Sequence, residues 1–136
     1  MSLKTLESKI KYRMSRSKNS VFTPRDFFDL SDRDQVGRVL RRLVVRQNLI
    51  KIGYGLYARS RVSTLTGRVM PEKSLPDLAK EALTRLGVQV VSSSFEQKYN
   101  RGTTTQVPTG RVIGVKGRVS RKIGYNGKYI TLEHVA

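Results

Sequence analysis

An arginine-rich segment carries the side chains best suited to recognising another molecule. Within "DQVGRVLRRLVVRQ", residues 34–47, the polar residues Gln35, Arg38, Arg41 and Arg42 recur at short intervals. A guanidinium group can donate paired hydrogen bonds to a phosphate or to the two major-groove acceptors of guanine, and a glutamine amide can pair with adenine. These residue types predict a surface that binds nucleic acid.

Helical periodicity divides this segment into an apolar face and a basic face. With 100° per residue, one set of side chains lies within about 60° of Val36: Val39, Leu40, Leu43 and Gln47. The opposite face carries Asp34, Gln35, Arg38, Arg41 and Arg42. We therefore expect a helix that packs on a core through one side and offers its arginines on the other.

The neighbouring segments predict the elements that position this helix. Leu3, Leu6, Ile10 and Met14 recur at helical spacing, which indicates an amphipathic helix over residues 3 to about 16. A short second helix begins with the cap Thr23, followed by Pro24, Phe27, Phe28 and Leu30. The third helix, capped by Ser31 with Asp34 in a capping-box-like position, runs to about Gln47. "LIKIGYGLYA" then reads as a hairpin, in which Gly53 and Gly55 permit positive φ angles.

Three helices followed by a hairpin predict a winged helix-turn-helix, in which the third helix enters the DNA major groove. We expect the following residues to contact DNA: Arg25, Arg33, Gln35, Arg38, Arg41, Arg42, Lys51, Tyr54 and Arg59. Within this set, we expect Gln35, Arg38 and Arg42 to read bases. Arg25, Lys51 and Arg59 are expected to hold phosphates, and Tyr54 is either a backbone contact or a turn residue.

The second half predicts a smaller α+β domain. Residues 1–61 form the first domain, the Pro-containing stretch 62–75 reads as a linker with a strand-like patch near Val69, and residues 76–136 form the second domain. "DLAKEALTRLG" predicts a helix, "RGTTTQVPTG" an irregular loop, and "VQVVSSS", "RVIGVKG", "SRKIGY" and "KYITLEHV" predict strands. Asn126-Gly127 is a strong hairpin signal. We therefore expect one helix on a small antiparallel sheet.

A second basic surface is expected in this domain. Strand alternation would bring several cations onto one exposed face: Arg111, Lys116, Arg118, Arg121 and Lys122. This surface would either extend a DNA footprint or serve the antitoxin role discussed below.

Charge indicates a polyanionic partner. The chain has 27 Lys+Arg against 10 Asp+Glu, a formal net charge of +17, and a pI near 10.9. A membrane is the weaker candidate, because no apolar run approaches the roughly 20 residues that span a bilayer and the amino terminus lacks the apolar block of a secretory signal. We expect a cytoplasmic protein that associates with the bacterial nucleoid.

Residues that could perform catalysis do not form a recognisable site. His134 is the only histidine and there is no cysteine, so neither a metal site nor a nucleophile-base pair is indicated. Asp77 and Glu81 lie four residues apart without a partner histidine, and the glycines at 110, 114 and 117 lack the Gly-Lys-Ser/Thr of a Walker loop. We expect no enzymatic activity, no metal and no cofactor.

Two segments also carry a resemblance to a known family. "VGRVLRRLVVRQNLIKIGYGLYA" resembles the amino-terminal domain of type IV toxin-antitoxin antitoxins, the abortive-infection antitoxin family. "SLPDLAKEALTRLGVQVVSSS" and "TTTQVPTGRVIGVKGRVSRKIGY" are similar to the domain that follows it in a subgroup. The resemblance implies a winged helix that represses its own operon and a second domain that counters a nucleotidyltransferase-like toxin without a stable complex. Longer members carry a larger second domain.

The sequence therefore predicts a sequence-specific regulator that binds a double-stranded DNA operator, with two copies on the DNA. The alternative is an RNA- or ribosome-binding accessory protein that uses the same basic surface. Base-reading side chains on a helix favour DNA, whereas aromatic side chains stacked on an open sheet would favour RNA. The chain has only 10 aromatic residues, 4 Phe and 6 Tyr, and most are explained as core, which favours DNA.

Overall fold

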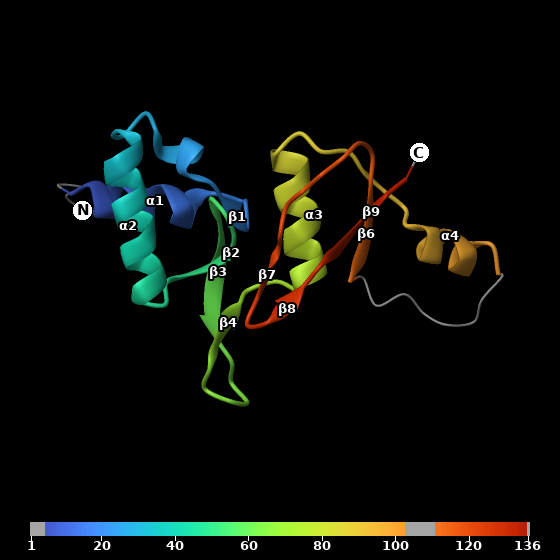
Figure 1. The fold of residues 1–136 in the computed structure, drawn as a ribbon. Helices are drawn as coiled ribbons and strands as arrows, with labels where there is room; N and C mark the ends of the chain where they lie inside the picture. The colour runs from blue at the N-terminus through green and yellow to red at the C-terminus, as the bar shows by residue number, and fades with distance from the viewer. Residues whose placement is uncertain (1–4, 103–110, 136) are drawn as a thin grey trace. The chain divides into compact units, whose positions relative to one another are not determined.

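A computed structural model describes residues 5–102 and 111–135 and has the expected α+β fold (Figure 1). The chain forms two compact units, Met1–Glu72 (unit 1) and Lys73–Ala136 (unit 2). Among the helices within these ranges, none is long and apolar enough to cross a membrane.

Unit 1 contains the first and third helices and the hairpin that the sequence predicts, whereas the predicted second helix is a single 3-10 turn. Its elements are α1 (Leu6–Arg16), β1 (Val21–Phe22), the 3-10 turn η1 (Pro24–Phe27), α2 (Arg33–Val45), β2 (Leu49–Gly53), β3 (Leu56–Val62) and β4 (Val69–Pro71). Strand β3 is central: β1, β2 and β4 all pair with it in antiparallel fashion. The order of elements and the strand order β1-β3-β2 fit the predicted winged helix-turn-helix.

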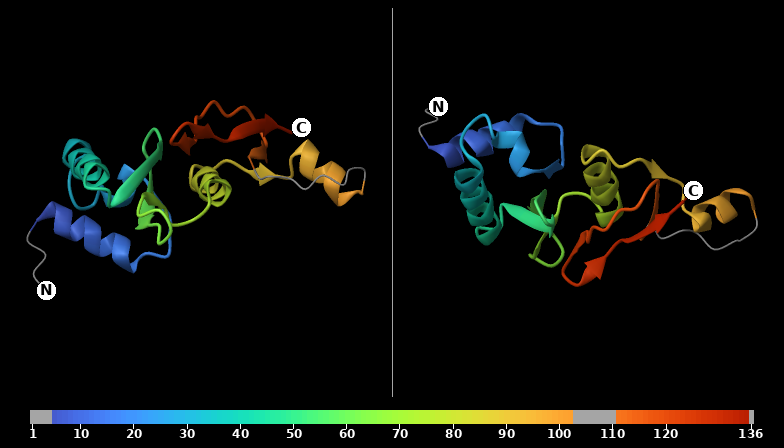
Figure 2. Two further views of the ribbon diagram at one scale, coloured as in Figure 1. Left: turned by 90° about the horizontal axis from the view of Figure 1, so that it is seen from below. Right: turned by 45° about the horizontal axis from the view of Figure 1, so that its top comes forward.

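The core of unit 1 lies between α1, α2 and the strands (Figure 2). Helical spacing accounts for it, because Ile10 and Met14 on α1 and four residues of α2 are buried: Val36, Val39, Leu40 and Leu43. Gln47 does not join them. Since α2 ends at Val45, Gln47 lies in the following turn, exposed and with φ 65°.

The starts of the helices depend on short polar side chains. The Thr5 hydroxyl accepts a hydrogen bond from the Ser8 amide at 3.1 Å, and the Thr23 amide donates to Asp26 Oδ2 at 2.9 Å in the single turn of η1. Helix α2 is capped by Asp32, whose Oδ1 accepts from the Gln35 amide at 2.8 Å. The predicted cap Ser31 is therefore wrong by one residue, and the carboxylate of Asp32 interacts favourably with the positive end of the helix dipole.

The hairpin β2–β3 turns through Tyr54 and Gly55, and only one of its glycines needs a positive φ angle. Gly55 has φ 67°, while Gly53 pairs with Leu56 at the end of β2 without a positive φ angle. The pairing shifts between Lys51 and Gly53. The hairpin is thus the predicted one, but the positive φ angle occurs only at the second glycine.

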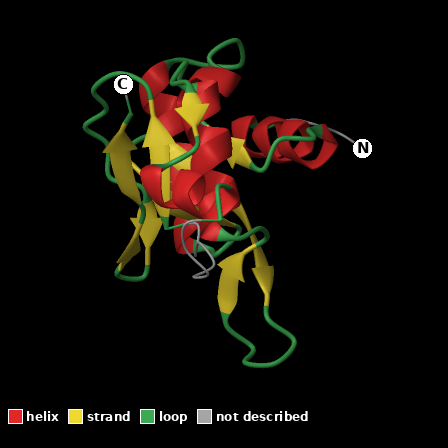
Figure 3. Ribbon diagram, turned by 90° about the vertical axis from the view of Figure 1, so that its right-hand side faces the viewer, coloured by secondary structure: helices red, strands yellow, loops and turns green. Residues whose placement is uncertain are grey.

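The predicted linker 62–75 is wrong, because most of it folds within unit 1. Strand β3 continues to Val62, and β4 pairs with it in the register Ser60↔Pro71, Arg61↔Met70 and Val62↔Val69. We call residues 60–71 the β3–β4 arm (Figure 3). A three-residue strand shows no alternation of its own, and its pairing is determined by β3, which lies next to it in space.

Unit 2 combines two helices with short strands: α3 (Leu75–Arg85), β5 (Val90–Val91), α4 (Ser94–Asn100), β6 (Val112–Val115), β7 (Gly124–Tyr125), β8 (Lys128–Tyr129) and β9 (Thr131–His134). The predicted helix is confirmed as α3, capped by Ser74 and followed by Gly87 with φ 82°. Asn126 and Gly127 form the predicted β7–β8 turn, with φ 53° and 77°. Residues 103–110 of the predicted loop lie outside the described residues.

Three predictions for unit 2 are wrong. Strand β6 pairs antiparallel with β5 but parallel with β9, so the three-stranded sheet is mixed rather than antiparallel. "KYITLEHV" forms two strands, β8 and β9, and helix α4 was not predicted. Gly114 shows how tight the sheet is, because a Cβ atom there would lie 2.7 Å from the carbonyl oxygen of Val91.

Candidate nucleic-acid interface

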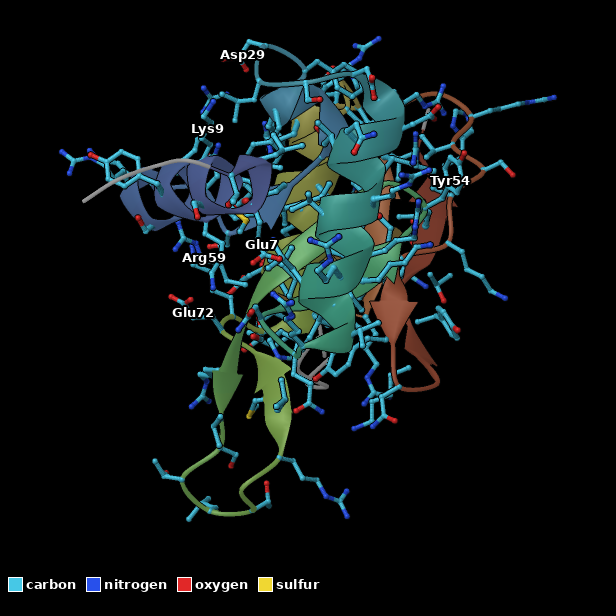
Figure 4. The ribbon with its side chains drawn as sticks, turned by 90° about the vertical axis from the view of Figure 1, so that its left-hand side faces the viewer. Glu7, Lys9, Asp29, Tyr54, Arg59 and Glu72 are labelled. Carbon is cyan, nitrogen blue, oxygen red and sulfur yellow. The ribbon has the colours of Figure 1, made fainter. Side chains whose placement is uncertain are left out.

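The side of α2 opposite the core presents polar and basic side chains. Gln35, Arg38 and Arg41 are exposed, and Val45, on the same side, is 82% exposed. In Figure 4, α2 lies in front of the strands of unit 1. Because four of its apolar residues are buried in the core, α2 holds its outer side chains on a rigid support.

One edge of this face borders the β2–β3 hairpin. A Cβ atom at Gly37 would lie 3.2 Å from Arg41 Nη1, so the absence of a side chain at 37 leaves room for the Arg41 guanidinium. Burial raises the pKa of Tyr57, and the positive charge of Arg41 opposes this change. Tyr54, at the hairpin tip, is 78% exposed and lies beside α2 (Figure 4). The helix face and hairpin tip form one surface, which we call the α2–hairpin surface.

The other edge of the helix faces α1 and is occupied by an ion-pair cluster. Arg46 Nη1 lies 2.8 Å from Glu7 Oε1, and Arg42 Nη1 lies 3.6 Å from the same atom. The guanidinium of Arg42 is therefore directed toward α1. This contact argues against the predicted role of Arg42 as a base reader and makes it a link between the two helices.

Arg59 also has a partner inside the protein. Its Nη2 donates to the carbonyl oxygens of Met14 and Ser17, the latter at 2.5 Å, and its Nε donates to that of Asn19 at 2.9 Å. The guanidinium carbon lies 5.3 Å from the centre of the Phe22 ring. A cation at the carboxyl end of α1 interacts favourably with the negative end of the helix dipole. These contacts argue against the predicted phosphate contact of Arg59, because its Nε and Nη2 donate to carbonyl groups within unit 1.

A third internal pair joins α1 to the segment after η1. Arg13 Nη1 and Nη2 donate to Asp29 Oδ1 and Oδ2 at 2.5 and 2.8 Å, and Nη1 also donates to the carbonyl oxygen of Asp26 at 2.8 Å. The hydrogen bond to Arg13 lowers the pKa of Asp29, and the same contact raises the pKa of Arg13. Arg13 is thus part of the scaffold.

The other predicted DNA contacts are exposed in unit 1. Arg25 lies in η1, Arg33 is the first residue of α2, and Lys51 lies on β2 opposite Tyr57. Exposure is necessary for a phosphate contact but does not test it, so their roles stay predictions.

The predicted second basic surface lies mostly on a connecting segment. All five residues are exposed: Arg111, Lys116, Arg118, Arg121 and Lys122. Residues 116–123 join β6 to β7 without belonging to a strand, so the alternation argument fails for Lys116, Arg118, Arg121 and Lys122. Lys122 Nζ lies 4.9 Å from the centre of the Tyr129 ring.

Residues that could support catalysis are dispersed. His134 Nδ1 lies 2.8 Å from the carbonyl oxygen of Gly117, and Asp77 lies in the first turn of α3. Within residues 5–102 and 111–135, no group of three or more histidine, cysteine, aspartate or glutamate side chains could hold a metal ion.

The strand-like patch predicted near Val69 is confirmed as β4, but its pairing with β3 into the β3–β4 arm was not predicted. Arg61 and Arg68 are exposed on it, and Leu65 at its tip is 94% exposed. A local signal for the hairpin is Thr66-Gly67 between two stretches that each contain a valine and an arginine, but the prolines nearby made the segment resemble a linker.

The chain belongs to a family of unknown function, DUF6088, which matches residues 6–135. No curated protein and no solved structure gives a match. The family covers both units, so their combination is a property of the family.

Proposed function

We propose that this member of the DUF6088 family binds double-stranded DNA in a sequence-specific manner, with α2 in the major groove. The observation that carries the proposal is the division of α2 into a buried apolar side and an open side with Gln35, Arg38 and Arg41, next to the exposed hairpin tip. An α-helix fits the major groove, and a hairpin beside it can reach the neighbouring backbone.

Within this proposal the exposed residues have different roles. Arg38 and Gln35 would read base edges because they project from the rigid helix. Arg25, Arg33 and Lys51 would contact phosphates, and Arg41 would lie between the helix and hairpin contacts. Arg42 is left out of the base readers because Glu7 binds its guanidinium.

Regulation and toxin antagonism are further parts of the proposal that rest on the resemblance. A chain that binds its own operator, as two copies, would repress its own operon and associate with the nucleoid. Unit 2 would counter a nucleotidyltransferase-like toxin without a stable complex. A reporter fused to the chain's own promoter tests repression, and growth after expression of a toxin encoded in the same operon tests antagonism.

Selection from random duplexes with the full chain, followed by titration, tests DNA binding. Arg38→Ala should cost roughly 1–3 kcal/mol on the selected site and little on random DNA, whereas Lys51→Ala should weaken both alike. A surface that contacts about five phosphates should show a log-log salt slope of roughly −4 to −5. Equal losses for Arg38→Ala on both duplexes would contradict base reading.

Binding to double-stranded RNA tests the alternative function. At matched salt concentration, the selected DNA duplex should bind more tightly than any RNA duplex of the same length. The deep and narrow major groove of A-form RNA does not admit α2. Tighter binding to RNA would therefore contradict the proposed docking of α2 and favour the RNA-binding accessory protein.

A further inference from the structure

The β3–β4 arm extends beyond the body of unit 1. Strand β2 ends its pairing with β3 at Leu49↔Arg59, while β3 continues to Val62 and pairs there with β4 alone. The arm projects from the end of the unit opposite Asp29 (Figures 3 and 4). Its position beyond the carboxyl end of α2 would bring it to the DNA next to the groove that α2 occupies.

The tip of the arm has an ordered conformation. The Ser63 amide donates to the Arg68 carbonyl oxygen, and the Gly67 amide to that of Ser63, both at 2.9 Å. Ser63 Oγ accepts from the amides of Leu65 and Thr66 at 3.3 Å, and Gly67 has φ 71°. This turn presents Leu65, 94% exposed, as the foremost large apolar side chain of the arm.

The strand register places two arginines on one face behind the tip. Arg61 pairs with Met70, and Ser63 is hydrogen-bonded to Arg68. Since alternate residues share a face, Arg61 and Arg68 are diagonal neighbours, at about 7–8 Å between their Cα atoms. The arm, residues 60–71, contains no acidic residue.

We propose that this arm enters the DNA minor groove beside the α2 site, with Leu65 against or between the bases and Arg61 and Arg68 at the phosphates. This inference rests on the proposed function. A narrow tip with one large apolar side chain suits a groove about 6 Å wide, and apolar wedges backed by arginine are a general mode of minor-groove binding. A protein partner fits less well, because Leu65 and Val62, the exposed large apolar side chains of the arm, lie among cations and offer little of the apolar contact area of a stable interface.

Substitution of Leu65 tests the wedge directly. Because Leu65 is exposed, Leu65→Ser should leave the unfolding temperature of the full chain unchanged. It should weaken binding to the selected duplex by on the order of tenfold, because burial of the leucine is lost. Leu65→Met, which keeps the apolar volume, is the matched control and should bind like the parent chain. With 2-aminopurine placed beside the α2 site, fluorescence should rise on binding of the parent and of Leu65→Met, but not of Leu65→Ser.

Base analogues identify the groove. Inosine in place of guanine removes only the minor-groove amino group, and 7-deazaguanine removes only a major-groove acceptor. In the sequence beside the α2 site, inosine should change the affinity of the parent chain but not of Leu65→Ser, and 7-deazaguanine should have no effect. The reverse pattern would place the arm in the major groove and overturn the proposal.

The outcomes separate this inference from the proposed function. If Arg38→Ala loses base preference while Leu65→Ser matches the parent in affinity and fluorescence, DNA binding stands and the arm proposal is overturned, which leaves Leu65 as a protein contact. If the parent chain prefers no duplex over random DNA, the proposed function fails and the arm proposal fails with it.

Discussion

The two units carry similar charge but arrange it differently. Residues 1–72 contain 16 Lys+Arg and 6 Asp+Glu, net +10, and residues 73–136 contain 11 and 4, net +7. In unit 1, Arg13, Arg46 and Arg59 bind groups of the protein, while Arg38 projects from a helix anchored in the core. In unit 2, four of the five predicted cations lie on the segment 116–123, between strands.

This difference in how the cations are held distinguishes general affinity for a polyanion from recognition of a DNA sequence. A cation attracts a polyanion wherever it is exposed, but base reading requires that its donors keep a fixed position relative to the groove. Unit 1 has such a support in α2, and its internal ion pairs hold α1 against that helix. We therefore expect sequence preference in unit 1 and general polyanion attraction in unit 2.

The largest expected effect is the difference in sequence preference between the two units when each is studied as a separate fragment. A fragment of residues 1–72 should fold and keep a preference of at least about a thousandfold for the selected site over random DNA, whereas residues 73–136 should bind both about equally. Fluorescence anisotropy titrations measure this ratio. A fragment ending at residue 64, the control, lacks β4 and should be less stable than 1–72. A preference of residues 73–136 for the selected site would contradict the assignment of sequence reading to unit 1 alone.

Two arginines of unit 1 should respond in opposite ways. Arg59→Ala removes hydrogen bonds to three carbonyl groups and should lower the free energy of unfolding by about 2–3 kcal/mol. Arg38→Ala should change it by no more than about 0.5 kcal/mol, while it lowers binding to the selected site. Urea unfolding and DNA titration on both variants measure the two effects. An unchanged stability for Arg59→Ala would contradict its structural role.

Cations of unit 2 should show the behaviour of nonspecific contacts. If they contact phosphates, Lys116→Ala and Arg118→Ala in the full chain should each reduce the log-log salt slope by about one and weaken selected and random duplexes equally. Lys80→Ala, at an exposed position of α3 outside the predicted basic surface, is a charge-matched control that should change neither. A loss confined to the selected site would show that unit 2 reads sequence.

The Arg13–Asp29 pair should give the smallest effect, because the side chains of Arg13 and Asp29 are 39% and 63% exposed and solvent screens their charges. The pKa of Asp29 is lowered in the folded chain, so the pair stabilises the fold above the ordinary carboxyl pKa of about 3.9. This stabilisation is lost as the pH falls through the lowered value. Asp29→Asn should therefore be less stable than the parent at neutral pH and equal to it in acid, as thermal unfolding at several pH values would show. A difference that persists in acid would exclude the ion pair as its cause.

Local patterns in the sequence determined much of the fold. Helices α1, α2 and α3 follow from apolar residues at helical spacing, and the β7–β8 turn follows from Asn126-Gly127, because each depends on residues close together in the chain. The buried residues Val36, Val39, Leu40 and Leu43, and with them the exposed side of Arg38, were predicted for the same reason.

Tertiary structure decided the partners of the charged side chains and of the short strands. An exposed Arg38 and a bound Arg59 are the same residue type, and only the folded chain brings the carbonyl groups of residues 14–19 to Arg59. The same holds for Arg42 beside Glu7, for β4 beside β3, and for the parallel pairing of β6 with β9. Each of these contacts joins segments that are distant in the sequence, or strands that are too short to give a periodic signal. The positions of these segments therefore follow from the packing of the longer elements.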